Sequence, residues 1–390
     1  MFRVPRAPSQ LAERLETFRI GLFATQRGVD DARLLCMTRI GLFSLADHLP
    51  DPVTGQVSSV RQRLVELVEQ GVLAEQVGFE RFAVGEHHFT NYLVPNANLL
   101  LSAIAARTDR IRLFTTVTLL ACRHVIQLAE DVGVLDQMSG GRIELSVARG
   151  VTFEGAGHFG VSEDNVYRAL EEKLVELLRV LSTGQLEPGE FNQRPLAVVP
   201  RPLQTPTPPI WIGGGLSEES CDVAVRLGLP LILPSLFRHP EDYQPIVDRY
   251  RNGMMARGSP ERVRLGMPNY CWVAKTTQAA RAEWRPRLEQ YVAAVQNLRG
   301  GFGRGVDFES LMAGPAICGS PAEVVDRIGF INERIGLDNH ILLMDVGGMP
   351  FGELSEALEL MGSEVLPHFN RGVATLNPVS PVSPNGALNS

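Results

Sequence analysis

Eight short apolar segments of the sequence alternate with segments in which apolar residues recur at helical spacing. The apolar segments, which we predict as strands, are 39–46, 81–86, 111–119, 142–149, 210–212, 229–233, one within 262–274, and 340–346. A strand that is repeatedly followed by a helix builds a parallel sheet, because the helix returns the chain to the edge where the next strand starts. Eight such units predict the α/β class and a (β/α)8 TIM barrel with insertions.

An open, doubly wound parallel sheet is the alternative fold for the same alternation. Sheets of that kind that bind dinucleotides carry a G-x-G-x-x-G turn after the first strand. The glycine run at Gly213-Gly214-Gly215 lacks that spacing. The pattern therefore favours the barrel.

The two ends of the 390-residue sequence differ from the part between them. Residues 1–37 are rich in arginine and carry no strand pattern, so we expect an extension that is either disordered or the product of a misassigned start. Acidic residues among them argue against a mitochondrial presequence. Residues 371–390 combine proline, glycine, serine and asparagine, which is typical of a disordered tail. The barrel is therefore predicted to occupy residues 38–370.

Composition excludes several classes of function. The formal net charge of -7 has the wrong sign for a nucleic-acid-binding protein. The five cysteines are far apart and form no C-x-x-C pair, which argues against a disulfide framework or a zinc ribbon and favours a cytoplasmic location. No apolar run approaches the roughly 20 residues that span a bilayer. We therefore expect a small-molecule substrate and no nucleic-acid or membrane partner.

Two adjacent histidines follow a glutamate at the end of the second predicted strand, in Glu86-His87-His88-Phe89. Barrel enzymes carry catalytic side chains at strand ends, so His87 or His88 is a candidate acid, base or hydrogen-bond donor. A metal site is an alternative, because histidines and a carboxylate bind zinc or iron. Neighbouring side chains of a strand point to opposite faces, which disfavours a metal. Side chains that only hydrogen-bond to a loop are a third interpretation.

The fourth predicted strand combines small or polar residues with an arginine at its end. Glu144, Ser146 and Ala148 alternate with larger apolar residues and are expected to face the barrel axis. Arg149 follows at the rim, beside Gly150. A guanidinium presents paired donors to a phosphate, and glycine lets the backbone approach closely. Arg149 is therefore a candidate phosphate ligand, with a surface ion pair as the alternative.

The glycine run at the end of the fifth predicted strand lies two residues before Ser217 and a predicted helix. Backbone N–H groups at the start of a helix attract anions, and Ser217 can cap the helix or bind a phosphate oxygen. Tight turns also use glycine, so the run alone is a weak signal. Together with Arg149, it predicts an anion site for a phosphorylated cofactor at the barrel mouth.

Several segments resemble the bacterial luciferase-like, flavin-dependent monooxygenases. They are 86–90 with the histidine pair, 115–118, the long segment 127–150, and the helix start at 318–324. The resemblance extends over nearly the whole predicted barrel. It implies a homodimeric oxidoreductase that uses reduced FMN supplied by a separate flavin reductase. It also implies that the flavin reacts with O2 to a C4a-(hydro)peroxide, which oxidises a small organic substrate.

The resemblance also implies roles for single residues. His87 corresponds to the catalytic histidine of the family, and Arg149 to the arginine that contacts the flavin phosphate. Val151 stands where the backbone contacts the isoalloxazine ring. The Thr116–Val117 peptide corresponds to a non-proline cis bond beneath that ring. Ala148 replaces a reactive cysteine of luciferase, so thiol modification is not expected there.

The resemblance leaves the substrate and part of the cofactor site open. Gly214 and Gly215 stand where luciferase has Glu-Ser, so these glycines and Ser217 are only candidate cofactor contacts. Segment 91–95 departs from luciferase, and light emission is therefore not implied. Some relatives use a deazaflavin for hydride transfer, and others bind flavin without turnover. A deazaflavin-dependent dehydrogenase and a non-catalytic flavin-binding protein are thus the alternatives, although the histidine pair and strand four favour FMN.

Overall fold

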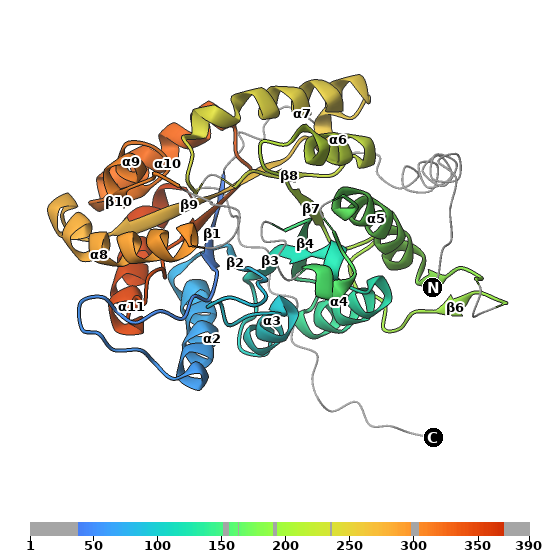
Figure 1. The fold of residues 1–390 in the computed structure, drawn as a ribbon, viewed down its shortest axis with the longest axis horizontal. Helices are drawn as coiled ribbons and strands as arrows, with labels where there is room; N and C mark the ends of the chain where they lie inside the picture. The colour runs from blue at the N-terminus through green and yellow to red at the C-terminus, as the bar shows by residue number, and fades with distance from the viewer. Residues whose placement is uncertain are drawn as a thin grey trace.

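Parallel strands close into a barrel with helices on its outside (Figure 1). The computed structural model describes residues 38–150, 156–162, 164–189, 193–234, 236–297 and 304–369. Within these residues, each strand of the barrel pairs with the next in parallel, and the last pairs with the first, which confirms the predicted (β/α)8 fold. Around the barrel the order is β1 (Arg39–Ser44), β2 (Arg81–Val84), β3 (Arg112–Leu119), β4 (Ile143–Ala148), β7 (Ile210–Gly213), β8 (Leu231–Ile232), β9 (Leu265–Val273) and β11 (Asn339–Leu343).

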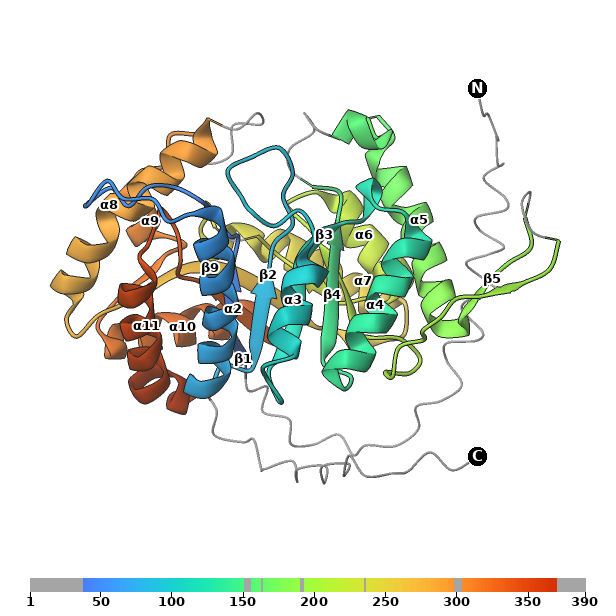
Figure 2. The ribbon, with the colours of Figure 1, turned by 90° about the horizontal axis from the view of Figure 1, so that it is seen from below.

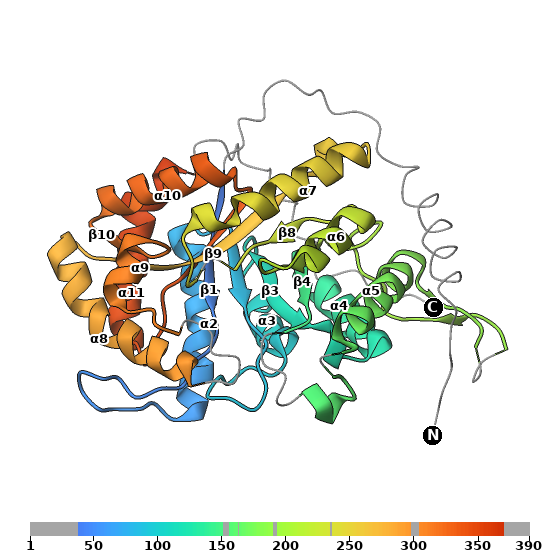
Figure 3. The same ribbon diagram turned by 45° about the horizontal axis from the view of Figure 1, so that its top comes forward.

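Helices carry the chain back along the outer surface of the barrel, where Figure 3 shows them as a ring. In Figure 2 the central strands run in one direction, so that their C-terminal ends share one rim. Within the described ranges, no helix is both long and apolar enough to cross a bilayer. The helices are α2 (Val60–Val77), α3 (Ala97–Ala105), α4 (Val125–Ser139), α5 (Val166–Thr183), α6 (Glu218–Leu227), α7 (Gln244–Ala256), α8 (Thr277–Gln296), α9 (Phe308–Ala313), α10 (Pro321–Ile335) and α11 (Phe351–Leu360).

The structure corrects several predicted details. The strand predicted over 81–86 ends at Val84, the last residue of β2 that pairs with β3. Beyond it, the N–H of Gly85 donates to Ser44 of β1 and the N–H of His87 donates to Val94 in the following loop. Ser162 precedes an apolar stripe at helical spacing and is therefore the N-cap predicted from the sequence, but it does not cap α5. Asn165 is the N-cap residue, and its Oδ1 accepts the N–H of Ser162 at 2.9 Å. The short strands β5 (Gln185–Leu186), β6 (Leu196–Ala197) and β10 (Ile317–Gly319) were not predicted, whereas the two-residue β8 lies within the predicted apolar segment 229–233. The predicted extension 1–37 and tail 371–390 lie outside the described residues.

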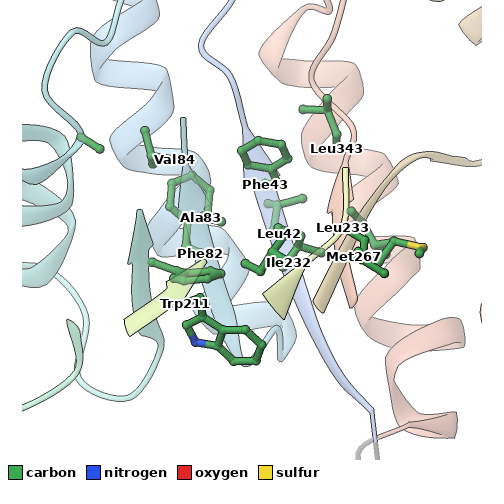
Figure 4. Packing of buried hydrophobic residues seen from close by; sticks show 14 of the residues in the cluster. Leu42, Phe43, Phe82, Ala83, Val84, Trp211, Ile232, Leu233, Met267 and Leu343 are labelled. Atoms are coloured by element: carbon green, nitrogen blue, oxygen red, sulfur yellow. The ribbon is translucent and has the colours of Figure 1, made fainter. Parts of the chain in front are cut away.

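Apolar side chains fill the barrel and the layer between strands and helices. Leu42 of β1 lies in register with Phe82 of β2 and with Leu342 of β11, and none of the three is exposed. Figure 4 shows how such side chains from different strands gather at the centre, with Trp211 of β7 below Phe82. Each fully buried side chain of this size contributes about 1.5–3 kcal/mol. The sheet is therefore held from both faces, as a closed parallel barrel requires.

A polar group inside the lower half of the barrel is fully compensated. Glu144 of β4 accepts from Arg81 Nη2 at 3.1 Å, from Arg112 Nε, and from Trp211 Nε1 at 3.2 Å. Burial alone would raise the pKa of Glu144, but the two arginines hold it below its ordinary value. The predicted inward orientation of Glu144 is thus explained by its three partners, which lie on β2, β3 and β7.

A buried charge cluster ties the loops after β1 and β11 to α2. Arg63 of α2 donates to Asp345 Oδ2 at 2.7 Å and to the backbone oxygen of Asp47 at 3.2 Å. Asp345 also accepts from Ser44 Oγ, and Asp47 accepts the N–H of Gly347 at 2.9 Å. Burial raises the pKa of Asp47 to about 6, with Arg63 opposing the shift. Removing one partner of a buried ion pair is costly, so this cluster fixes the rim of the barrel beside β1.

Gly347→Ala should destabilise the protein by about 2–5 kcal/mol, through backbone strain and overpacking together. Its φ is 71°, and an added Cβ would lie 1.9 Å from the carbonyl oxygen of Arg287. The matched control is Gly329→Ala in the middle of α10, where an added Cβ meets nothing within 4 Å. Helix propensity predicts that this control gains about 0.5–1 kcal/mol. Denaturant unfolding measures the stability of both variants. Equal stabilities would contradict the strain and close contact that the structure places at Gly347.

Candidate active site

The candidate residues gather at the rim where the barrel strands end. His87 and His88 follow β2, Thr116 lies near the end of β3, Arg149 follows β4 and Ser217 follows β7. Parallel strands that leave a barrel at one rim bring their following loops together. Figure 2 shows the loop after β2 above this rim, next to the ends of β3 and β4.

The ring of His87 is held by one aromatic contact. After β2, the backbone N–H of His87 donates to the oxygen of Val94 at 3.1 Å, which closes the loop on itself. The imidazole stacks on Tyr92, with centroids 4.2 Å apart and planes at 29°. Among the described residues, neither ring nitrogen has a hydrogen-bond partner. Burial, with a smaller contribution from His88, lowers the pKa of His87 to about 4, so the ring is neutral at physiological pH.

His88 is held differently, because its ring is engaged by Glu86. His88 Nε2 lies 3.0 Å from Glu86 Oε1, and the same carboxylate accepts from Arg123 Nε at 3.1 Å and Nη2 at 2.9 Å. Arg123 Nη2 also donates to the oxygen of Pro95. Glu86 therefore fastens the loop after β2 to the loop after β3. Within the part of the chain that the structure describes, no group of three side chains is placed as metal ligands.

An aromatic contact joins the loop after β2 to the short helix that follows β4. His88 lies 5.0 Å from the ring of Phe159, and Phe89 lies 5.7 Å from His158 and 6.1 Å from Phe159. Phe89 has a φ of 58° and remains 70% exposed. A bulky residue with positive φ is unusual. This contact places apolar surface beside His88 at the rim.

Three tyrosines that contact one another, one of which stacks on His87, were not singled out from the sequence. Tyr92 Oη lies 2.9 Å from Tyr291 Oη of α8, and the rings of Tyr291 and Tyr270 of β9 meet edge to face at 5.9 Å. Tyr270 is fully buried, and its hydroxyl has no partner among the described residues. Tyr92 belongs to the segment that departs from luciferase, whereas Tyr291 lies 199 positions away in a helix, where no motif marks it.

The ends of β3, β4 and β7 meet beneath the rim. The Thr116–Val117 peptide is cis, as the family resemblance implies. A Cβ added at Gly213 would lie 2.7 Å from Val117 Cγ1 and 3.0 Å from Ala148 Cβ, so these three residues are in direct proximity. Thr116 is buried, and its Oγ1 has no partner within the described part of the chain. Ala148 and Gly213 have small side chains or none, so little side-chain volume lies beside the cis peptide here.

Arg149 lies at the end of β4 with its guanidinium over an aromatic ring. Its Cζ is 5.0 Å from the ring centroid of Tyr167, near the start of α5. A guanidinium can stack on an aromatic ring in this way, and its planar set of donors matches the geometry of a phosphate. Gly150 follows with a φ of 92°, a conformation that favours glycine. Val151, the predicted backbone contact, lies outside the described residues.

In the turn after β7, some groups of the predicted anion site are engaged by other parts of the protein. The N–H of Gly214 donates to the oxygen of Ile232 at 2.9 Å and is therefore not available to a phosphate. Ser217 is the N-cap residue of α6, but its side chain makes no cap hydrogen bond and instead contacts Ser220 Oγ at 3.4 Å. Glu218 stands in the first turn of α6 and pairs with Arg249 at 2.9 Å. A Cβ added at Gly215 would meet only the backbone nitrogen of Ser217, at 3.9 Å, so Gly215 is the less crowded glycine of the pair.

Comparison with known proteins places this site in context. The oxygenase component of the flavin-dependent trigonelline monooxygenase of Acinetobacter baylyi is 28% identical over 349 residues, covering 84% of this chain and 95% of that protein. The crystal structure of the monooxygenase RslO1 from Streptomyces bottropensis is 26% identical, with a TM-score of 0.76, and matches 85% of this chain and 100% of that chain.

More distant structures share the fold but differ in cofactor. The oxygenating constituent of 3,6-diketocamphane monooxygenase from Pseudomonas putida, in complex with FMN, has a TM-score of 0.70 at 20% identity, covering 85% of this chain and 98% of that one. The coenzyme F420-dependent tetrahydromethanopterin reductase of Methanopyrus kandleri has a TM-score of 0.63 at 20% identity, covering 85% and 99%. The family model described as luciferase-like monooxygenase matches residues 38–339. The chain is therefore an enzyme that belongs to the luciferase-like monooxygenase family.

Proposed function

We propose that this enzyme is an FMNH2-dependent monooxygenase that transfers one oxygen atom of O2 to a small organic substrate. The observation that carries the proposal is His87, a neutral imidazole at the barrel rim with no hydrogen-bond partner among the described residues. Its neighbour His88 is engaged by Glu86, so His87 is the histidine of the pair that can serve a ligand. The name of the trigonelline monooxygenase, which is a flavin-dependent oxygenase component, supports the same reaction class.

The residues present fit a flavin at the rim. Thr116 Oγ1 and the Tyr270 hydroxyl are buried without hydrogen-bond partners among the described residues, and a bound ligand would provide these partners. Arg149 offers a planar guanidinium for a phosphate, and Gly215 leaves room beside the N-cap Ser217. Gly214 contributes to the shape of the turn rather than a donor. We propose that Arg149, Gly215 and Ser217 hold the FMN phosphate, with Thr116 and Ala148 beside the ring.

The chain's own residues then have defined tasks. Bound reduced FMN would supply the two electrons that O2 needs. His87 is neutral, so one of its ring nitrogens can accept a proton and the other can donate a hydrogen bond to the reacting oxygen or the substrate. Phe89 and Phe159 present apolar surface at the rim and help to exclude water from the site. Such exclusion limits the loss of O2-derived oxidant as hydrogen peroxide.

We infer two partners of the chain. A separate flavin reductase supplies FMNH2, as the word component in the name of the trigonelline enzyme supports. A second copy of the chain forms a homodimer through the early helices. Apolar side chains exposed on α2, α3 and α4 support this contact; they include Val65, Leu99 and Met138. We also propose a cytoplasmic location, which the five widely spaced cysteines favour.

The cofactor experiment compares FMN with coenzyme F420. We expect FMN to bind, and bound reduced FMN to be reoxidised by air with release of hydrogen peroxide when no substrate is present. Binding titrations and absorbance spectra measure both steps. Tight binding of F420 without binding of FMN would contradict the proposal and favour a deazaflavin-dependent dehydrogenase.

Arg149→Ala should weaken FMN binding about ten- to a thousandfold, because charge-assisted hydrogen bonds contribute roughly 1.5–3 kcal/mol each. Riboflavin, which lacks the phosphate, should lose little affinity. Arg226→Ala, which removes an arginine that pairs with Glu171 on the surface, is the matched control and should bind both flavins normally. Fluorescence titration measures the four affinities. Equal losses for FMN and riboflavin would exclude the phosphate role of Arg149.

His87→Ala should slow product formation by about 10²- to 10⁴-fold, the usual contribution of general acid–base catalysis. The substrate is first found by testing an alkanal, a ketone, an amine, a sulfonate and trigonelline with FMNH2 and O2. Because reduced FMN still meets O2, hydrogen peroxide should rise as product falls, while FMN affinity stays near the wild-type value.

His88→Ala is the neighbouring control for this variant. It removes the contact with Glu86 and should lower the stability of the protein. The rate of product formation should change little, because Arg123 still holds the Glu86 carboxylate and with it the loop that carries His87. Unchanged product yield in His87→Ala would remove His87 from the mechanism. A loss confined to His88→Ala would assign the chemistry to the other histidine.

A further inference from the structure

The tyrosine that stacks on His87 contacts a second tyrosine through its hydroxyl. The two segments that supply them are far apart in the sequence: Tyr92 follows β2, and Tyr291 lies on α8. Their Oη atoms are 2.9 Å apart, and Tyr291 is 2% exposed. Neither the family resemblance nor the proposed function assigns them a role.

The orientation of His87 depends on this pair. Among the described residues, the imidazole has no hydrogen bond from its ring nitrogens, so only packing fixes its plane. Its stacking partner is Tyr92, at 4.2 Å and 29°. Such aromatic pairs are individually weak. The orientation of the His87 ring therefore depends on how firmly the ring of Tyr92 is held.

Tyr92 in turn is held at both ends. Its backbone forms an antiparallel bridge with Asp47, a member of the buried cluster around Arg63. Its hydroxyl meets that of Tyr291, whose ring packs edge to face on Tyr270. Burial raises the pKa of Tyr92 to about 12, so the phenol stays neutral and acts as a hydrogen-bonding group rather than an acid.

We propose that Tyr92 and Tyr291 are positioning residues: their hydroxyl contact fixes the ring of Tyr92, and the ring of Tyr92 fixes the imidazole of His87 toward its substrate. This inference deepens the proposed function and rests on it for the role of His87. A ring that is free to rotate spends less time in the productive orientation. The contact should therefore act on the chemical step and not on flavin affinity.

The first experiment measures His87 without flavin or substrate. Diethyl pyrocarbonate acylates an unprotonated imidazole nitrogen, and mass spectrometry of fragmented peptides resolves His87 from His88. We expect Tyr92→Leu, which removes stack and hydroxyl, to raise the acylation rate of His87 about two- to tenfold, in line with the loss of one aromatic pair. Tyr92→Phe and Tyr291→Phe keep the stack and should each raise it less.

The double variant Tyr92→Phe/Tyr291→Phe completes a cycle. Both single changes remove the same contact, so the double variant should equal either single variant instead of multiplying them. The matched control is Tyr250→Phe in α7, which deletes a buried hydroxyl that donates to the backbone oxygen of Leu229 at 2.9 Å. It should lower the melting temperature comparably and leave His87 reactivity unchanged. Wild-type reactivity of His87 in Tyr291→Phe, or a multiplicative double variant, would overturn the proposal.

The second experiment uses the substrate that the wild-type enzyme oxidises. Product per FMNH2 should fall in the order wild type, the phenylalanine variants, Tyr92→Leu, with kcat affected and KM and FMN affinity unchanged. Changed His87 reactivity with an unchanged product share would overturn the catalytic part of the inference. If the proposed function itself fails, the acylation rates still decide whether the tyrosine pair positions the ring.

Discussion

Closure of the parallel sheet is the constraint on which the rest of this structure depends. Every barrel strand must pair on both sides, and the contacts of β8 with β9 and of β11 with β1 complete the ring. Because all strands run the same way, their following loops meet at one rim. Segments from β2, β3, β4 and β7 that are distant in the sequence are thereby brought beside one another.

The rim is made rigid by polar contacts behind the candidate site rather than in it. Arg63 with Asp345 and Asp47 fixes the loops after β1 and β11, and Glu86 with Arg123 fixes the loop after β2. The hydrogen bonds of these groups connect loops of the protein to one another. The ring nitrogens of His87 make no hydrogen bond to the described residues and can therefore bind a ligand. The proposed chemistry depends on this difference between charged groups that hold the loops together and a neutral histidine whose ring makes no hydrogen bond to the described residues.

Sequence patterns predicted the fold and the rim, but not the contacts that set the site. The alternation of strands and helices is local, so the barrel was predicted correctly. The Gly140-Gly141 pair is an equally local helix-end signal, and α4 ends there as that pair predicts. The cap at Ser162 was wrong, because Asn165 competes for the same turn. The pairing of Tyr92 with Tyr291 depends on how α8 packs over β9 and has no local signal. The engaged N–H of Gly214 likewise follows from the register of β7 on β8.

The central claim is that O2 delivers an oxygen atom to the substrate at this rim. It is tested most directly by running the reaction with FMNH2 and isotopically labelled ¹⁸O2, then measuring the mass of the product. The account predicts that one labelled atom enters each product molecule, and that the second is found in water. A product that carries no label, or one formed by hydride transfer without O2, would contradict it.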